Sequence, residues 1–314
     1  MYRRCAFAVV FIQFIALAAT AQDASSLIAE GDAWLQKGEY QKALGRYDEA
    51  VKVSPTAMSY VARARALYAM DHLDGYLMDV ERALRMDSTI AEAHVQRAIY
   101  ALRSQDQRRA VRHCNSALAL DLSPVLRPHA LIARGIALAD LGRRAEAIAD
   151  LRAGLELDPH DVEALGTLAR MLDATGDHAE ALPLLERLCE LEPNDPGHWT
   201  NRGFELARLG RHDEALLIYD RALDLDRDEP LALSNKAASL LAMGREDEAM
   251  KNVQRSLRVY PANPFALRTR AMLYVKKGEI EKACEDLHLT RVLGGVPDVD
   301  TLISRHCSQL TPKR

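Results

Sequence analysis

The most constraining feature of this 314-residue chain is a pattern that returns about every 34 residues. One column of small side chains shows it, at separations of 33, 34, 37, 34, 34, 34 and 34 residues. Its members are Gly31, Ala64, Ala98, Gly135, Ala169, Gly203, Ala237 and Ala271. A fixed period of this length indicates stacked structural units, each of which buries its apolar face only against its neighbours.

Two more columns and a regular set of turn residues divide each period into two helices. The second column contains Ala43, Tyr76, Ala110, Ala147, Ala181, Ala215, Ala249 and Ala283, and the third contains Ala50, Ala83, Ala117, Gly154, Leu188, Ala222, Ser256 and Thr290. Glycine follows the first column at Gly38, Gly142, Gly176, Gly210, Gly244 and Gly278, and proline follows the third at Pro55, Pro159, Pro193 and Pro261. Because glycine accepts a positive φ and proline stops a helix, the pattern predicts helical hairpins.

Composition agrees with an all-α fold. Hydrophobic residues make up 48% of the chain but aromatic residues only 5%, so the core must be built from leucine and alanine, which favour helix. Large apolar residues recur at helical spacing, and no alternating strand pattern is present.

These residues resemble the tetratricopeptide repeat family, most closely at "LGRRAEAIADLRAGLELDP" (141–159) and "LGRHDEALLIYDRALDLD" (209–226). The resemblance implies an α-α superhelix, or solenoid, of about eight hairpins over residues 22–295. The expected repeats are 24–56, 57–90, 91–124, 128–161, 162–195, 196–229, 230–263 and 264–295. Residues 296–314 are expected to form a capping helix and tail, and one face of this helix carries Val299, Leu302, Ile303, His306 and Leu310.

Three repeats depart from the family pattern. The second has Tyr76 in the alanine column and Asp71 in the glycine column, and the third has Gln105 for the turn glycine and His94 at a large apolar position. We expect these hairpins to be looser. Three additional residues, 125–127, precede the fourth repeat and predict a local bulge.

The first residues are typical of a secretory signal peptide. Arg3 and Arg4 precede an apolar stretch over residues 5–19, and Ala19-Thr20-Ala21 matches a small-residue cleavage site. We therefore expect residues 1–21 to be removed and the protein to be periplasmic or extracellular, either free or peripherally attached to the cell envelope. The alternative is an uncleaved membrane anchor. The remaining chain has no second apolar run of spanning length.

The resemblance implies that the first helices line the inner groove of the superhelix. Polar and apolar side chains of these helices that the packing columns do not use are candidate partner-binding residues: Gln96, Thr167, Arg170, Asn201, Phe204, Arg208, Asn235, Arg268 and Met272. Gln96, Asn201 and Asn235 share one column, and family members use such an amide ladder to pair with the backbone of an extended peptide. The alternative is that these amides are ordinary solvated residues.

A basic column has two interpretations. Its members are Arg63, Arg97, Arg134, Arg202, Lys236 and Arg270, and Asp79, Asp150 and Asp286 follow three of them by sixteen residues. The column could bind phosphate or an acidic ligand. The favoured interpretation is that arginine and aspartate brace the two helices of a hairpin, because a buried charge needs a partner.

Four cysteines remain after the leader. Cys284 and Cys307 are the predicted disulfide, since the cap helix should pack near the last repeat and export permits oxidation. A metal site of Cys284, His288, His306 and Cys307 is the alternative. Cys114 and Cys189 occupy packing positions and are predicted to be buried free thiols.

The sequence indicates binding rather than catalysis. No nucleotide, hydrolase or metalloprotease motif is present, the repeats leave no room for a catalytic domain, and no cofactor is expected. With 41 basic and 45 acidic residues, the chain lacks the basic excess of a nucleic-acid binder. We expect a non-catalytic scaffold that binds segments or helices of envelope proteins. A structural, self-associating subunit of an envelope complex is the alternative.

Overall fold

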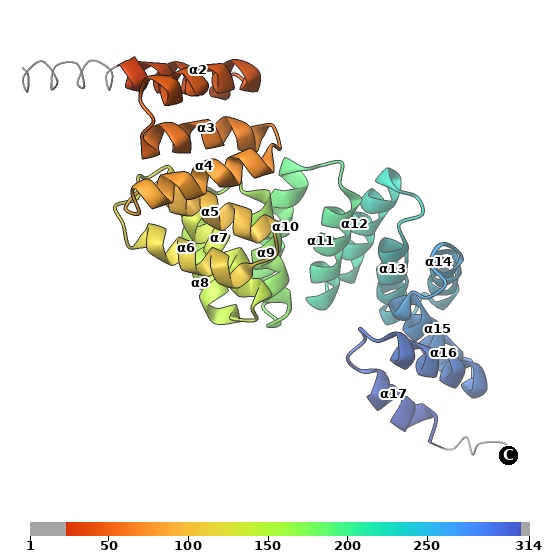
Figure 1. The fold of residues 1–314 in the computed structure, drawn as a ribbon. Coiled ribbons are helices and arrows are strands. Elements are labelled where there is room, and N and C mark those ends of the chain that lie inside the picture. The colour runs from red at the N-terminus through yellow and green to blue at the C-terminus, as the bar shows by residue number, and fades with distance from the viewer. Residues whose placement is uncertain (1–22, 309–314) are drawn as a thin grey trace, which may run out of the picture. The chain divides into compact units, whose positions relative to one another are not determined.

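The fold was analysed in a computed structural model that describes residues 23–308. Regular structure in this range is entirely helical (Figure 1). The chain divides into two units, Met1–Pro159 and His160–Arg314, and each is described by itself. No helix among the described residues is long and apolar enough to cross a bilayer. The predicted leader, residues 1–21, lies outside that range.

The described part of the first unit consists of helical hairpins (Figure 1). Helical residues 23–36 pair with α2 (Tyr40–Val53), and the next pairs are α3 (Ala57–Ala69) with α4 (Leu73–Met86) and α5 (Ala91–Arg103) with α6 (Gln107–Leu118). The last pair is α7 (Leu126–Asp140) with α8 (Arg144–Leu157). The three additional residues lengthen the α6–α7 connection and the first turn of α7.

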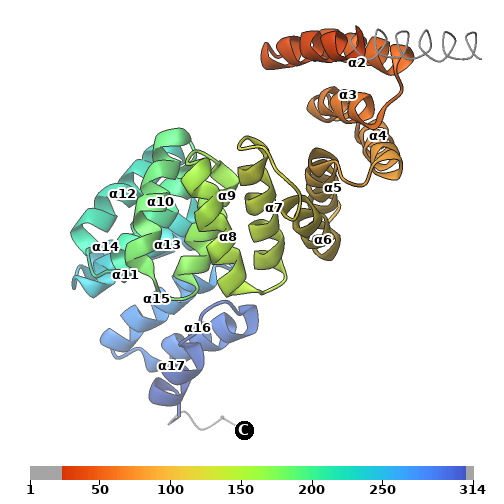
Figure 2. The ribbon, with the colours of Figure 1, turned by 90° about the vertical axis from the view of Figure 1, so that its left-hand side faces the viewer.

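The second unit repeats the same arrangement (Figure 2). Its pairs are α9 (Val162–Asp173) with α10 (His178–Leu191), α11 (Pro196–Arg208) with α12 (His212–Leu225), α13 (Pro230–Ala242) with α14 (Glu246–Val259), and α15 (Pro264–Lys276) with α16 (Ile280–Leu293). A shorter helix, α17 (Val299–His306), packs against α16. The fold class is therefore the predicted all-α solenoid of hairpins.

Small and large side chains complement each other inside each hairpin. A Cβ atom added to Gly203 would lie 2.5 Å from Cε1 of Tyr219, and one added to Gly31 would lie 2.5 Å from Cε1 of Tyr47. Where the second helix offers a smaller side chain, such as Val253, the first helix carries an alanine, Ala237. The small-residue columns therefore set how closely the two helices approach.

The expectation of looser second and third hairpins is wrong. Asp71 and Gln105 adopt positive φ values of 59° and 57°, although neither is glycine. The backbone amides that follow still close the helix ends, since His72 N donates to Leu67 O at 2.9 Å and Asp106 N to Ala101 O at 2.8 Å. Tyr76 is buried, and its hydroxyl donates to Gln96 O at 2.5 Å. These hairpins keep the common turn at a cost in backbone strain.

The last hairpin carries the expected cap. Val299, Leu302 and Cys307 are buried in one cluster with Ala283 and Leu287 of α16. Cys284 and Cys307 form a disulfide across 23 residues, so their thiols cannot form the alternative metal site. Leu310, the last residue expected on the apolar face of the cap helix, lies outside the described residues.

Candidate protein-interaction surface

Five of the predicted groove residues of the second unit remain accessible on the first helices. Arg170 on α9 and Asn201 and Arg208 on α11 are exposed, while Phe204 on α11 and Asn235 on α13 are half-buried. Because α11 packs against α13 and Asn201 and Asn235 hold the same position in their repeats, the two amides lie on neighbouring helices in register. Neither amide has a hydrogen-bond partner among residues 23–308, so both can pair with a ligand.

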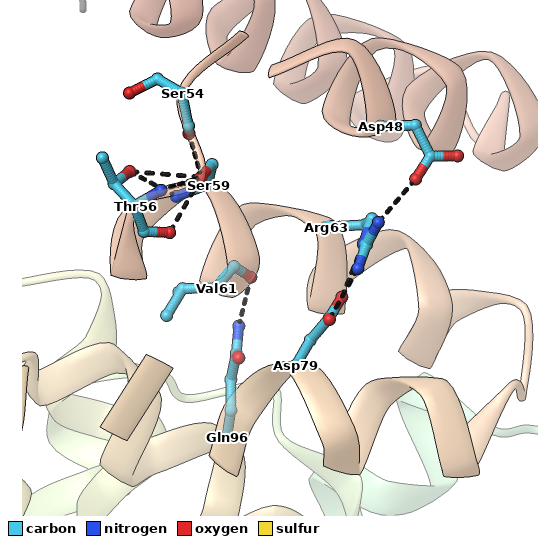
Figure 3. A network of polar contacts seen from close by, with 8 residues as sticks. All are labelled: Asp48, Ser54, Thr56, Ser59, Val61, Arg63, Asp79 and Gln96. Atoms are coloured by element: carbon cyan, nitrogen blue, oxygen red, sulfur yellow. Dashed lines mark hydrogen bonds and ion pairs between the residues drawn. The ribbon is translucent and has the colours of Figure 1, made fainter. Parts of the chain in front are cut away.

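Gln96 and Thr167 do not have the surface position that their column suggested. Both side chains are buried, with 8% of each residue exposed. Gln96 belongs to the first unit, and its Nε2 donates to Val61 O at 3.2 Å (Figure 3). The same Nε2 also donates to Glu92 Oε1 at 3.2 Å. The amide ladder within one described unit is thus reduced to Asn201 and Asn235.

Arg268 and Met272 serve the cap. Arg268 donates from Nε to Oδ1 of Asp298 at 2.9 Å, and its Nη2 also contacts that carboxylate. This hydrogen bonding holds the pKa of Asp298 below its usual range. Met272 packs against the cluster of α16 and α17. Both residues therefore contact the cap and help to hold it against the last hairpin.

A buried carboxylate lies on the same helix as Asn201 and Arg208. Glu205 on α11 is 3% exposed and accepts from His178 Nδ1 at 2.8 Å, and Arg208 Nε donates to His178 Nε2 at 3.3 Å. Burial raises the pKa of Glu205, and the hydrogen bond from His178 opposes that shift. The sequence analysis did not single out Glu205. The next repeat has Ser239 at the same position, and that side chain is also buried, so comparing the two repeats could have indicated that the carboxylate is buried.

Two clusters of the second unit have metal-ligand chemistry. One is Asp173, His178 and Glu205, and the other comprises Glu192, Asp195 and the partly buried His198. In the first, the nitrogens of His178 already contact Glu205 and Arg208, and a guanidinium opposes a bound cation. In the second, both carboxylates are exposed. Neither arrangement argues for a metal ion.

The basic column braces the hairpins, as the favoured interpretation predicted. Arg63, Arg134 and Arg270 each donate from Nε and Nη2 to both oxygens of the aspartate sixteen residues later, at 2.6–2.8 Å. Figure 3 shows the pair formed by Arg63 and Asp79. The hydrogen bond to Asp79 is the largest cause of the raised pKa of Arg63. The column is therefore occupied by carboxylates of the chain itself.

The other three cations of the column turn toward the preceding hairpin. Arg97 Nη2 lies 3.2 Å from Glu81 and Arg202 Nη2 lies 3.0 Å from Glu186, while Lys236 pairs with Asp220. These repeats have His113, Ile218 and Asn252 where Asp79, Asp150 and Asp286 stand. Because the bracing aspartate is absent from its own hairpin, each cation pairs with the carboxylate sixteen residues before it.

A second arginine network in the first unit was not foreseen. Arg65 donates from Nε and Nη2 to the two oxygens of Glu92 at 2.6 Å each, and from Nη1 to Asp32 at 2.6 Å. Tyr47 donates to the same Asp32 oxygen at 2.6 Å, and burial raises the pKa of Tyr47. The spacing of 27 residues between Arg65 and Glu92 is the signal that could have revealed this link.

The free thiols are buried, as predicted. Cys114 and Cys189 are buried and unbonded to one another. Burial raises the pKa of Cys114 to about 12 and that of Cys189 to about 11. Because the thiolate is the nucleophilic form, neither residue suggests chemistry.

Comparison with known proteins agrees with this architecture. Models of the tetratricopeptide repeat match residues 132–196, 200–266 and 31–54. The chain belongs to the tetratricopeptide repeat family.

Known relatives cover the chain in part. The TPR repeat-containing thioredoxin TTL4 of Arabidopsis thaliana is 34% identical over 97 residues, which are 31% of this chain and 14% of that protein. A solved structure described as YrrB, a TPR protein with an unusual peptide-binding site, is 24% identical with a TM-score of 0.51, covering 60% of this chain and 97% of that one. The APC/C hetero-tetramer Cut9-Hcn1 is 17% identical with a TM-score of 0.54, and the match covers 77% of this chain and 48% of that one. At these identities the structural matches show the fold alone.

Proposed function

We propose that this protein is a non-catalytic scaffold that binds an extended segment or a helix of another protein on the first-helix surface of residues 160–308. The observation that carries the proposal is the pair of accessible, unpartnered amides, Asn201 and Asn235, in register on α11 and α13. Each amide offers both a donor and an acceptor, which matches a peptide backbone. Phe204 supplies an apolar contact beside them, and Arg170 an unpaired positive charge.

The fold supports binding on this surface. A stack of hairpins presents an extended surface of repeated helices, which suits a long, narrow partner. One solved protein of similar fold is described as having a peptide-binding site. We propose that the partner lies in the cell envelope, because residues 1–21 match a signal peptide. Oxidation of Cys284 and Cys307 is compatible with that compartment.

Site-specific photo-cross-linking in intact cells tests the proposal. A photoreactive amino acid is placed at Phe204, and in a matched chain at Leu217, which is 71% exposed on the second helix α12. We expect a discrete partner at position 204 that is absent at position 217. The partner should be lost when Arg170→Glu, Asn201→Ala and Asn235→Ala are combined.

A control variant separates recognition from general surface change. Gln254→Ala and Arg258→Glu alter exposed polar residues on α14 and should leave the cross-link at position 204 intact. Identical products at positions 204 and 217, or persistence of the product in the groove variant, would exclude the first-helix surface as the binding site.

A further inference from the structure

The second helix of the third hairpin differs from every other second helix in its charge. Helix α6 contains three arginines and no acidic residue, whereas α2, α4, α8, α10, α12, α14 and α16 each contain at least two acidic residues. The acidic residue nearest its start is the N-cap, Asp106. In a chain whose net charge is −4, this helix is a local positive surface.

The three arginines share one exposed face of α6. Arg108 and Arg112 are four residues apart and Arg109 and Arg112 are three apart, so their side chains are neighbours on the helix surface. All three are exposed. Arg109 Nε lies 3.1 Å from Asp106, whereas Arg108 and Arg112 have no ion pair within residues 23–308. Two guanidinium groups thus face solvent without a counter-charge.

The residues near this helix do not supply the missing negative charge. His113 stands where other hairpins have the bracing aspartate, and Arg97 consequently keeps only Glu81 as an ion-pair partner. Arg97 is 5% exposed, and its buried Nη1 has no hydrogen-bond acceptor among the described residues. Burial and then the neighbouring His94, Arg97 and Arg112 lower the pKa of His113 to about 4.

The histidine pair does not replace the missing carboxylate. His94 Nε2 lies 3.0 Å from the carbonyl oxygen of Ser88, which only accepts, so Nε2 is the donor. The Nδ1 atoms of His94 and His113 lie 3.0 Å apart, so one of them donates to the other. The two rings therefore hydrogen-bond to each other, and an imidazole carries no negative charge that could offset the arginines.

We infer that the exposed face of α6, formed by Arg108, Arg109 and Arg112, docks an acidic segment of a partner protein. Elsewhere in this chain the same side-chain type pairs with carboxylates, as in the bidentate contact of Arg134 with Asp150. Guanidinium forks match carboxylates in geometry, and complementary charge gives specificity and a fast encounter. This face lies on a second helix, so it is separate from the first-helix surface of the proposed function.

Other anionic partners fit the helix less well. Helix α6 contains no Phe, Tyr or Trp side chain on which a base could stack, and its one imidazole, His113, already contacts the ring of His94. It also exposes no large apolar residue that could insert into a bilayer, since Val111 is buried and Leu118 is half-buried. Three arginines neutralise few phosphates, and the net negative charge of the chain opposes a polyanion at long range.

Fluorescence anisotropy of labelled poly-L-glutamate with the full chain tests the inference. We compare the triple variant Arg108→Gln, Arg109→Gln, Arg112→Gln with the triple variant Arg144→Gln, Arg258→Gln, Arg291→Gln. The second set removes three exposed arginines from α8, α14 and α16, so it changes the net charge equally. Circular dichroism and urea titration check that both variants fold. Duplex DNA and phosphatidylserine vesicles are the phosphate probes.

We expect the α6 variant to bind poly-L-glutamate about tenfold more weakly, as the loss of three surface ion pairs predicts, and the control to change by less than about twofold. The groove variant with Arg170→Glu, Asn201→Ala and Asn235→Ala should retain this binding. Equal weakening in both arginine variants, or no binding of poly-L-glutamate by the unmodified chain, overturns the inference. Tighter binding of DNA or vesicles that depends on the three α6 arginines overturns it as well, in favour of a phosphate surface.

Discussion

Arg63 donates from Nε and Nη2 to the two carboxylate oxygens of Asp79, at 2.7 Å each, and from Nη1 to Asp48 at 2.9 Å. One guanidinium on α3 therefore connects the second helix of its own hairpin with that of the preceding one. In a stack where each hairpin contacts only its neighbours, stability depends on such nearest-neighbour links. The arginine column thus joins repeats as well as helices.

Removing a buried brace should destabilise the chain more than removing an exposed one. Asp79→Asn leaves Arg63 half-buried with only Asp48, and we expect the free energy of unfolding to fall by about 2 kcal/mol. Asp220→Asn is the control, since the Asp220 side chain is 56% exposed beside Lys236 and should cost less than about 0.5 kcal/mol. Urea denaturation followed by circular dichroism measures both. Equal losses would contradict the role of burial in the brace.

The small-residue column makes a sharper prediction at Gly203. Its added Cβ would lie 2.5 Å from the ring of the fully buried Tyr219, so Gly203→Ala should lower the free energy of unfolding by about 2 kcal/mol. Gly166→Ala is the matched change in α9, where the nearest atom, Leu188 Cδ1, is 4.0 Å away. That variant should gain about 0.5 kcal/mol, because alanine favours helix. Thermal unfolding of the two variants would show shifts of opposite sign.

The hairpins were predictable from sequence because each depends on local contacts. The small residue at Gly203 and the turn at Gly210 are both required by the packing of two adjacent helices. Equivalent residues recur in the other repeats, so the pattern could be recognised from the sequence. The same reasoning predicted the pairing of Arg270 with Asp286, since both lie in one hairpin.

Contacts between hairpins were less predictable. Gln96 shares its column with Asn201 yet is buried against Val61 of the preceding hairpin, and Arg268 is engaged by Asp298 of the cap. Whether a given position of a repeat is exposed depends on the side chains of the neighbouring repeat. The 34-residue spacing alone does not predict those contacts.

The turn at Gln105 offers a route to stabilisation. Gln105 has a positive φ of 57°, a conformation that glycine adopts without strain. We expect Gln105→Gly to raise the free energy of unfolding by about 1 kcal/mol. The reverse change, Gly142→Gln at a φ of 74°, should lower it by a similar amount. Urea midpoints measure both changes, and a loss of stability in Gln105→Gly would show that the glutamine side chain contributes more than the strain removes.

Acid should weaken the third hairpin through His113. Its pKa is lowered to about 4 in the folded chain, against about 6.5 for an ordinary histidine. The folded state therefore favours the neutral ring, so this contribution is present above pH 6.5 and is lost as the pH falls through about 4. Because His113 is partly exposed, we expect a loss on the order of 1 kcal/mol.

A non-titrating variant isolates that contribution. His113→Gln should lose less stability than the unmodified chain between pH 7 and pH 4, as measured by urea midpoints at each pH. Carboxylates titrate in both proteins, so their effect cancels in the comparison. Parallel pH profiles would mean that the histidine pair has no net preference for its neutral form.

The disulfide should determine whether the cap stays on the last hairpin. Reduction, or the double variant Cys284→Ser, Cys307→Ser, opens a loop of 23 residues, and removing a link of this length costs about 3 kcal/mol in the chain-entropy account. Gly294 and Gly295 precede the cap, and among the described residues Asp298 forms an ion pair only with Arg268. We therefore expect α17 to open locally. Hydrogen exchange should rise over residues 299–307 and stay unchanged in α11 and α12. Arg268→Gln with the disulfide intact is the control, and it should raise exchange only slightly. Unchanged exchange in α17 after reduction would show that the apolar contacts of Val299 and Leu302 hold the cap without the covalent link.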